Sequence, residues 1–397
     1  MNPLRHFFHD LAVFPRDLKL LSVALFLWGA GDTLFFYVVP LYLARLGATP
    51  VQIGNVFSLS ALASVCTMIP AGILADRWGR KKIMMTGWML GTATGALMAI
   101  AGDLRWFTLG WIAYWLTGFV NPAITSYSTG GRGDLAPERA LTMTYAGFAL
   151  GTIISPALGG WIATQIGLRS LFAIATAMFA LSSFVIFLLR PQPVTHVASE
   201  GHYRDLLGNR RFIAFCALLC GVWFVMWLGY PLAPNFLADV RGLSVAKVGA
   251  LGSFNALGSL TLSLTLGRRP PRRAFVAAQG IVMIYLLILL RASWFGWIAL
   301  AYVARSAVFV SRTLAEAQAT RVVERSQWGL AFGTLETVAW TGAVLAPLLA
   351  GRLYAIQPAL PFQLSFALLP VVMLLTYFFS PRPALTPGLT PDPPSAS

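Results

Sequence analysis

Charged residues are scarce in this sequence. Only 11% of its 397 residues are Asp, Glu, Lys or Arg, whereas soluble proteins average about a quarter, and 57% are hydrophobic. The mean hydropathy is +0.71. Such a composition excludes a soluble globular protein and predicts an integral membrane protein whose solvent is the lipid bilayer.

Residues that usually carry catalysis or bind metals are also few. The chain has 3 cysteines and 4 histidines. Cys66, Cys216 and Cys220 fall in apolar segments without metal-ligand spacing, and the histidines lie in terminal or linker segments. No glycine-rich phosphate loop ending in Lys-Ser or Lys-Thr is found. We therefore expect no enzyme, no cofactor, no metal site and no ATP-driven pump.

Acidic residues are outnumbered by basic ones, which gives the chain a formal net charge of +15. A strong positive charge can indicate nucleic-acid binding. Here, however, the Lys and Arg residues lie in short loops between apolar runs rather than along one amphipathic face. The sequence therefore predicts no nucleic-acid partner.

Apolar runs of about 20 residues recur along almost the whole chain, and each can cross a hydrocarbon core of roughly 30 Å as a helix. The pattern predicts an all-α membrane protein with twelve transmembrane helices in two parallel repeats of six. The expected spans are Leu20–Leu43, Ile53–Leu74, Ile83–Ala101, Phe107–Ser128, Leu141–Thr164, Leu171–Leu189, Phe212–Leu237, Val248–Leu266, Phe275–Leu290, Trp297–Ala319, Leu330–Tyr354 and Phe362–Phe379.

One long connection divides the chain. Residues 191–211 are rich in Pro, His and charge and lack an apolar face, so we expect a cytoplasmic linker there. It separates an N-terminal bundle, 1–190, from a C-terminal bundle, 212–379. The remaining segment, 380–397, is rich in Pro and Ser and is predicted to be a disordered tail.

Two patterns occur once in each half. Residues 42–54 match 237–249 at equal length, and the pattern Gly-x₄-Pro-x-Leu-x-Gly at 151–160 recurs at 342–351. Gly54 thereby aligns with Gly249. Because both pairs run in the same direction, the halves are predicted to be parallel repeats about an axis normal to the membrane, with a substrate path between them.

The basic residues also predict an orientation. Roughly twenty of the Lys and Arg residues fall in loops on the side that holds both termini. The positive-inside rule assigns this side to the cytoplasm. We expect a multi-pass protein of the inner, cytoplasmic membrane with both termini in the cytoplasm, and we expect it to be a monomer.

Ionisable groups inside apolar spans are functional candidates, because each costs about 2.5–3.5 kcal/mol to insert. Asp32 lies in the first span between glycines, Glu336 lies about two turns into the eleventh, and Glu316 lies in the tenth. These three acids are our candidates for proton coupling. Asp32 could alternatively be a polar group satisfied by a neighbouring helix.

The tenth span carries a mixed face. Arg305, Phe309, Arg312 and Glu316 are spaced by four, three and four residues, which would align them on one side of a continuous helix. Arg312 and Glu316 could form a local ion pair that merely permits insertion. Alternatively, the face lines a cavity and binds a substrate or a proton.

Polar and aromatic residues of other spans extend this candidate cavity. The fourth span has a polar stripe that includes Asn121 and Thr125, and the seventh presents aromatic residues at helical spacing. The expected cavity-lining residues are Trp28, Asn121, Thr125, Trp223, Trp227, Tyr230, Arg305, Phe309, Arg312 and Trp340.

The stretch GILADRWGRKK at 72–82 resembles motif A, the loop between helices 2 and 3 of the major facilitator superfamily of transporters. Gly72, Asp76, Arg77, Gly79 and Arg80 stand at the motif positions. The resemblance implies alternating access and a latch that holds the outward-facing state. In that latch Asp76 meets the N-terminus of helix 11, and Arg80 pairs with Asp134. The second copy, 267–273, lacks the Asp.

The fifth span resembles the glycine-rich antiporter motif of the same superfamily, with Gly151, Pro156, Gly159 and Gly160 in place and Ser155 where a glycine is usual. Several proton-coupled drug exporters of the superfamily also carry an acid in helix 1. The resemblance therefore implies export of amphipathic or cationic drug-like molecules in exchange for protons, with Asp32 as the first choice of proton site.

Two other functions are consistent with the residues. Arg305 and Arg312 would make part of the cavity positive, which suits a carrier of an anionic solute or a lipid headgroup. The same fold could also serve a membrane sensor that transports nothing. Flux into vesicles with and without a pH gradient would separate these classes.

Overall fold

The computed structural model describes residues 13–192, 208–319, 322–323 and 328–380, and for 68–77 and 328–330 it describes the helix but not the side chains. The regular secondary structure of the described part is all helical, with no strand. Most of the predicted linker and nearly all of the predicted tail lie outside these residues, so both remain predictions.

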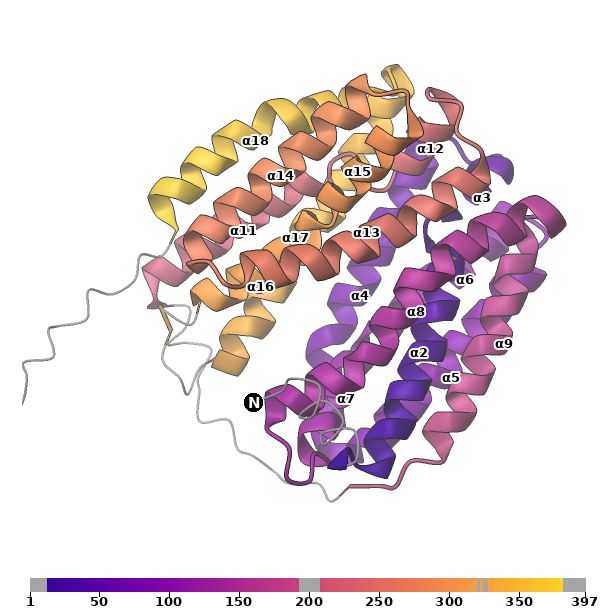
Figure 1. Ribbon diagram of the computed structural model, residues 1–397, viewed down its shortest axis with the longest axis vertical. Helices are drawn as coiled ribbons and strands as arrows, with labels where there is room; N and C mark the ends of the chain where they lie inside the picture. Colours follow the sequence, from indigo (N-terminus) through magenta and orange to yellow (C-terminus); the bar gives the residue numbers. More distant parts are fainter. Residues whose placement is uncertain (1–12, 193–207, 320–321, 324–327, 381–397) are drawn as a thin grey trace, which may run out of the picture.

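The chain forms two groups of helices that lie side by side (Figure 1). The first group contains α2 (Arg16–Phe36), α3 (Val39–Arg45), α4 (Pro50–Trp78), α5 (Arg80–Ile100), α6 (Leu104–Trp115), η1 (Leu116–Val120), α7 (Asn121–Gly130), α8 (Pro137–Ile166) and α9 (Leu168–Phe187). The second contains α11 (Arg210–Trp227), α12 (Ala233–Asp239), α13 (Val245–Leu266), α14 (Pro271–Arg291), α15 (Phe295–Arg305), α16 (Ala307–Ala319), α17 (Trp328–Ile356) and α18 (Leu360–Phe379).

These elements form the predicted spans, six in each half. Within the described residues, 9 helices are long and apolar enough to cross a membrane. The other three spans are α4, the segmented run α6–η1–α7, and α13. Phenylalanine and leucine side chains on the outer faces, such as Phe184 and Leu264, are exposed, as expected for surfaces solvated by lipid. The fold predicted from the sequence is confirmed.

Four spans are broken, which the prediction of continuous helices missed. Breaks separate α2 from α3, α11 from α12 and α15 from α16, and the 3₁₀ turn η1 interrupts the fourth span. Proline follows three of the breaks, at Pro40, Pro122 and Pro234, and proline disfavours helix at the residue before it. At the fourth break, the Ser306 hydroxyl donates to Val303 O at 2.7 Å, which competes with the helical ladder.

The predicted charged turn at 72–82 is also shorter than expected. Helix α4 continues to Trp78 and α5 begins at Arg80, so Gly79 alone lies between them. Gly79 has a φ of 91°, a conformation that residues with a Cβ atom rarely adopt. The motif is therefore largely the last two turns of α4, and a single glycine reverses the chain.

The repeated patterns pack crosswise between the halves. A Cβ atom on Gly54 of α4 would lie 2.3 Å from Pro347 O of α17, and one on Gly249 of α13 would lie 2.9 Å from Pro156 O of α8. Each first pattern thus packs against the second pattern of the other half. Asn235 Nδ2 also donates to Pro40 O at 3.1 Å, and these two positions are equivalent in the repeat. The contacts explain why small residues recur there.

The glycines of the antiporter-like motif mediate helix packing. A Cβ atom on Gly151 or Gly159 would lie 2.6 Å or 2.0 Å, respectively, from backbone atoms of α2. One on Gly160 would lie 2.6 Å from Ala246 O of α13. Helix α8 therefore uses two glycines to approach its own half and a third to approach the other half.

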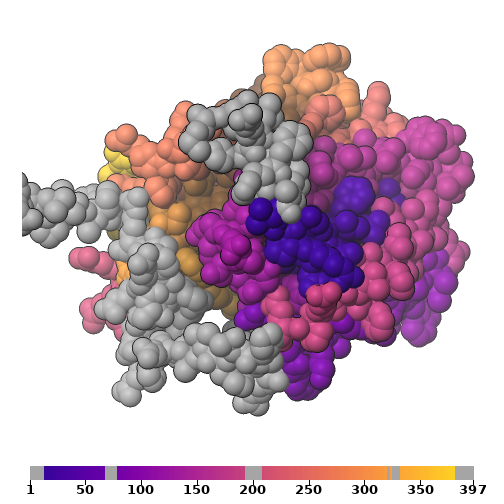
Figure 2. Space-filling model, turned by 60° about the horizontal axis from the view of Figure 1, so that its bottom comes forward, coloured from indigo at the N-terminus to yellow at the C-terminus, as the bar shows by residue number. Residues whose placement is uncertain are grey.

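The halves meet toward one end of the molecule. Close contacts between them involve the end of α4 that begins at Pro50 and the end of α8 near Ile166, and we call this the closed end. At the opposite end, no hydrogen bond or ion pair between described residues joins the halves. Figure 2 looks toward that end, where gold residues of the C-terminal half lie behind the magenta residues of the N-terminal half.

Candidate functional site

Asp32 lies within the N-terminal half, on α2, beside aromatic rings. The Tyr114 hydroxyl of α6 donates to Asp32 Oδ1 at 2.8 Å. The Trp28 ring stacks on Tyr114, with 6.1 Å between centroids, and contacts Phe179 of α9 at 4.6 Å. Asp32 forms no ion pair with any described residue. It is thus an acid without a cation, held by one hydrogen bond.

The glycines on either side of Asp32 have a packing role. A Cβ atom on Gly29 would lie 2.8 Å from Phe148, and one on Gly31 would lie 2.8 Å from Phe179. They let α8 and α9 approach α2 closely. These glycines therefore give no separate support for a ligand beside Asp32.

The predicted aromatic residues of the C-terminal half form one cluster. The Trp227 ring lies 6.0 Å from Trp223, 5.7 Å from Trp340 and 4.7 Å from Tyr230, centroid to centroid. Phe309 completes the cluster against Tyr230 at 5.7 Å. Trp340 also contacts Trp115 of the other half at 5.8 Å. Five residues from three separate segments of the chain thus form an apolar wall where the halves meet.

Arg312 of α16 lies between two acids. Its Nε is 3.5 Å from Glu316 Oε1, and it also pairs directly with Glu336 of α17. The i,i+4 contact anticipated from the sequence is present, and Glu336 adds a second carboxylate. Across the interface, Tyr145 of α8 lies beside Thr125 and within electrostatic reach of Arg312. Asn121 and Thr125 are exposed on α7.

Replacing Arg312, the cation shared by Glu316 and Glu336, should reveal how strongly Arg312 and Glu336 stabilise each other. Arg312→Gln leaves Glu316 and Glu336 facing each other, so we expect it to lower the free energy of unfolding in detergent. Adding Glu336→Gln should restore part of that loss, with a coupling energy of about 0.5–3 kcal/mol. Thermal unfolding of the two single variants and the double variant measures it. Additive losses would show that the two side chains act independently.

Arg305 has a different environment from Arg312, because the break at Ser306 divides the predicted face. The Arg305 side chain is 2% exposed, and its Nη2 donates to Tyr230 O at 3.1 Å. Its guanidinium carbon lies 3.5 Å from the Tyr230 ring centroid and 4.9 Å from that of Tyr302. Unlike Arg312, it makes no ion pair with a described residue.

The side chains of Asp76 and Arg77 lie outside the described residues, as does the side-chain environment of Gly72. Arg80 Nη1 donates to Gln192 Oε1 at 3.1 Å, and Asp134 is exposed. The expected Arg80–Asp134 pair is therefore absent in this conformation. The latch as a whole remains a prediction.

Several tyrosines near the site were not among the predicted site residues. Tyr37 accepts a hydrogen bond from Asn255 Nδ2 at 3.0 Å across the two halves, and Tyr114 holds Asp32. Tyr302 precedes Arg305 by three residues, a spacing that places both on one helix face. Two signals were available in the sequence: the spacing of Tyr302 and Arg305, and the position of Tyr114 seven residues before Asn121, which places it on the same polar stripe of the fourth span. No such signal pointed to Tyr37.

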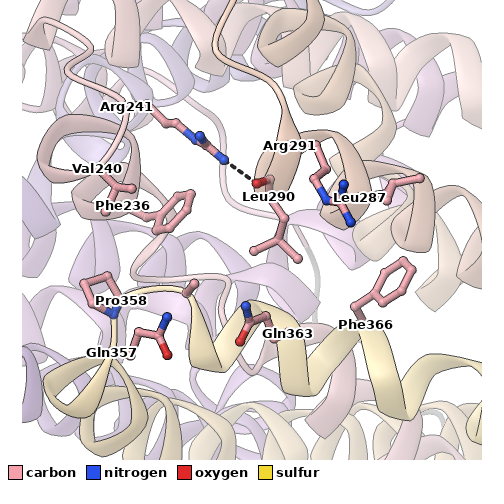
Figure 3. A pocket seen from close by; sticks show the side chains of 11 residues that line it. Phe236, Val240, Arg241, Leu287, Leu290, Arg291, Gln357, Pro358, Gln363 and Phe366 are labelled. Carbon is pink, nitrogen blue, oxygen red and sulfur yellow. Dashed lines mark hydrogen bonds between the residues drawn. The ribbon is translucent and has the colours of Figure 1, made fainter.

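One cavity lies away from these clusters. It measures about 430 Å³ and is lined by residues at the closed end of the C-terminal half, including Arg241, Arg291, Gln357 and Gln363 (Figure 3). Arg241 caps the end of α14 by donating to Leu289 O at 3.2 Å and to Leu290 O. None of the predicted site residues lines this cavity.

A much smaller cavity lies between the halves. It has room for about 10 Å³, roughly one water molecule. One wall comes from the N-terminal half and the other from the C-terminal half. The lining residues are Phe36, Tyr37, Pro40, Phe57, Trp115, Trp227, Tyr230, Pro231, Pro234 and Arg305.

Comparison with known proteins gives a consistent picture. The family model described as Major Facilitator Superfamily matches residues 21–311. The chain is 32% identical over 273 residues to a multi-drug resistance efflux pump PmrA homolog of Lactococcus lactis, covering 62% of this chain and 66% of that one. It is 26% identical over 254 residues to the enterobactin exporter EntS of Shigella flexneri, covering 62% and 60%. The matches thus span less than two thirds of these two relatives.

A solved structure matches the fold over most of the chain. A single-residue mutant of the nucleoside transporter NupG superposes with a TM-score of 0.79 at 14% sequence identity, covering 91% of this chain and 98% of that one. At so low an identity the likeness shows a shared fold and leaves the substrate open.

Proposed function

Because the chain belongs to the major facilitator superfamily of membrane transporters, we propose that it exports amphipathic aromatic molecules across the cytoplasmic membrane in exchange for protons. Membership of this family makes the chain a multi-pass transporter of small molecules. Coupling to protons, the direction of transport and the class of substrate are what we propose.

The observation that carries the proposal is the state of Asp32. It is an acid inside a transmembrane helix with one hydrogen-bond donor, Tyr114, and no cation partner among the described residues. An isolated carboxylate at this depth is costly, so binding a proton stabilises it. Its charge would therefore depend on which side of the membrane can deliver a proton to it, as coupling requires.

The aromatic residues support the substrate class. Trp223, Trp227, Tyr230, Phe309 and Trp340 provide large, flat apolar surfaces that accept aromatic molecules of varied shape. The names of the two relatives, a multi-drug resistance efflux pump homolog and an enterobactin exporter, support export rather than import.

The packing supports alternating access. Crosswise glycine contacts hold the closed end, while the other end lacks such contacts between described residues. Basic loops lie at the end opposite the closed end, so the positive-inside rule assigns that end and both termini to the cytoplasm. The structure would then be the inward-facing state, in which the motif A latch of Gly72, Asp76, Arg77, Gly79, Arg80 and Asp134 is released. We propose that one chain suffices for the cycle.

Transport driven by a pH gradient tests this proposal. Purified protein in liposomes with an acidic lumen is expected to accumulate a fluorescent aromatic amphiphile in the lumen as protons leave. With a probe that has no titratable amine, and so is not trapped by the acidic lumen itself, empty liposomes and liposomes without a gradient should show only equilibration. At a pH difference of about two units, exchange for one proton supports about a hundredfold accumulation, since each unit is worth about 1.36 kcal/mol. A sensor would give no flux in either condition.

A further inference from the structure

Arg305 is a buried cation whose charge no acid balances. Its side chain is 2% exposed, inside a membrane span, and no described carboxylate pairs with it. Burying an unpaired guanidinium in this setting is strongly unfavourable. The Tyr230 and Tyr302 rings offset part of that cost through cation–π contacts, but they do not replace a negative charge.

The hydrogen-bond donors around Arg305 are also in excess. By distance and angle, its Nε and Nη1 make no hydrogen bond, and neither do the buried hydroxyls of Tyr230 and Tyr302. The Tyr285 hydroxyl lies within reach of the Arg305 side chain. A buried donor without a partner destabilises the fold. Several donors and one positive charge therefore gather in one place where an acceptor with negative charge is missing.

The position of Arg305 connects it to the path between the halves. It lines the small cavity between the halves, together with Tyr37 and Trp115 from one half and Trp227 and Tyr230 from the other. The cavity has room for about 10 Å³ in this conformation, so an anion enters only when the aromatic rings part. Motion of one half against the other changes this volume directly, because both halves supply its walls.

We propose that Arg305 binds the anionic group of the substrate, a carboxylate, sulfonate or phosphate carried on an aromatic body. Arg312 does not serve this purpose, because Glu316 and Glu336 already balance its charge. The planar guanidinium suits an oxyanion, and the surrounding tyrosine hydroxyls add donors. This inference rests on the proposed function and narrows its substrates to organic anions or zwitterions.

A matched pair of probes tests the inference in the wild-type protein. Naphthalene-2-carboxylate and naphthalene-2-carboxamide share an aromatic body and differ in charge. We expect the carboxylate to bind about ten- to hundredfold more tightly in detergent, as measured by quenching of tryptophan fluorescence. Equal affinities, or no binding of either probe, would overturn the proposal.

Three variants assign the preference to Arg305. Arg305→Gln is expected to remove the advantage of the carboxylate and leave carboxamide binding unchanged. Arg305→Lys keeps the charge and should keep a preference for the carboxylate. Arg291→Gln removes an exposed arginine outside this cavity and should change neither affinity. A full acid preference in Arg305→Gln, or its complete loss in Arg305→Lys with carboxamide binding intact, would refute the assignment.

A second measurement covers the case in which Arg305→Gln does not fold. A cysteine replacing Phe57, which lines the same cavity, should be alkylated more slowly in the presence of the carboxylate than of the carboxamide. Equal protection would overturn the assignment. Because these experiments measure binding alone, failure of proton-driven transport with an intact acid preference would remove the proposed function and leave the anion site.

Discussion

Asp32→Asn is expected to abolish proton-driven accumulation while leaving substrate exchange without a gradient intact. The amide has the same shape as the protonated acid and can still accept the Tyr114 hydrogen bond, which measures 2.8 Å in the wild type. It cannot release a proton. Accumulation against a gradient should therefore fall by about a hundredfold at a pH difference of about two units, to the level of empty liposomes.

The matched control is Asp103→Asn. Asp103 caps α6 by accepting a hydrogen bond from Trp106 N at 3.0 Å, and asparagine is an equally good cap. This variant makes the same chemical change at the start of α6, away from Asp32, and should transport normally. Proton-driven accumulation by Asp32→Asn at the wild-type level would remove Asp32 from the mechanism and leave Glu316 and Glu336 as the coupling candidates.

The parts of the fold that depend on short sequence patterns could be predicted. Hydropathy located the spans because each must cover the same hydrocarbon thickness. The repeat pairing Gly54 with Gly249 anticipated two symmetric halves, and both glycines lie at close contacts between halves. Small residues recur at such positions because backbone atoms of the partner helix occupy the space of a side chain.

The breaks within spans were harder to predict. Hydropathy does not detect them, because the interrupted segments stay apolar. The prolines after three of the breaks are also compatible with a kinked but continuous helix. The break at Ser306 decides the chemistry of the tenth span. It places Arg305 among tyrosines and Arg312 between two glutamates, although a regular helix would have aligned both arginines.

The contacts within the site depend on four helices that come together only in the folded protein. Tyr37, Tyr230, Tyr285 and Tyr302 belong to spans one, seven, nine and ten, and no spacing in the sequence relates them. Nor could the sequence distinguish a paired arginine from an unpaired one, since Glu336 reaches Arg312 from a different span. The residue types were predictable, but their pairing was not.

Gly54→Leu is expected to hold the closed end apart. A Cβ atom at this position would lie 2.3 Å from Pro347 O and 3.2 Å from Gly351 Cα, both backbone atoms that cannot rotate away. One turn further along α4, Ser58 Oγ donates to Val344 O at 2.7 Å, which leaves little room for adjustment. If the overpacking costs about 1–3 kcal/mol, it shifts the equilibrium toward the outward-open state by about 5- to 150-fold.

The shift is measured as the accessibility of one cysteine to reagents added outside. This cysteine replaces Phe57 in a chain whose native cysteines have been replaced. A membrane-impermeant thiol reagent should label it in Gly54→Leu faster by the same factor, while transport slows because the outer end no longer closes. Gly221→Leu is the control, since no atom lies within 4 Å of its added Cβ. Gly160→Leu should act like Gly54→Leu, because its Cβ would lie 2.6 Å from Ala246 O. If Gly54→Leu and Gly160→Leu are labelled at the same rate as the protein without these substitutions and transport normally, the crosswise glycine contacts do not control opening of the closed end.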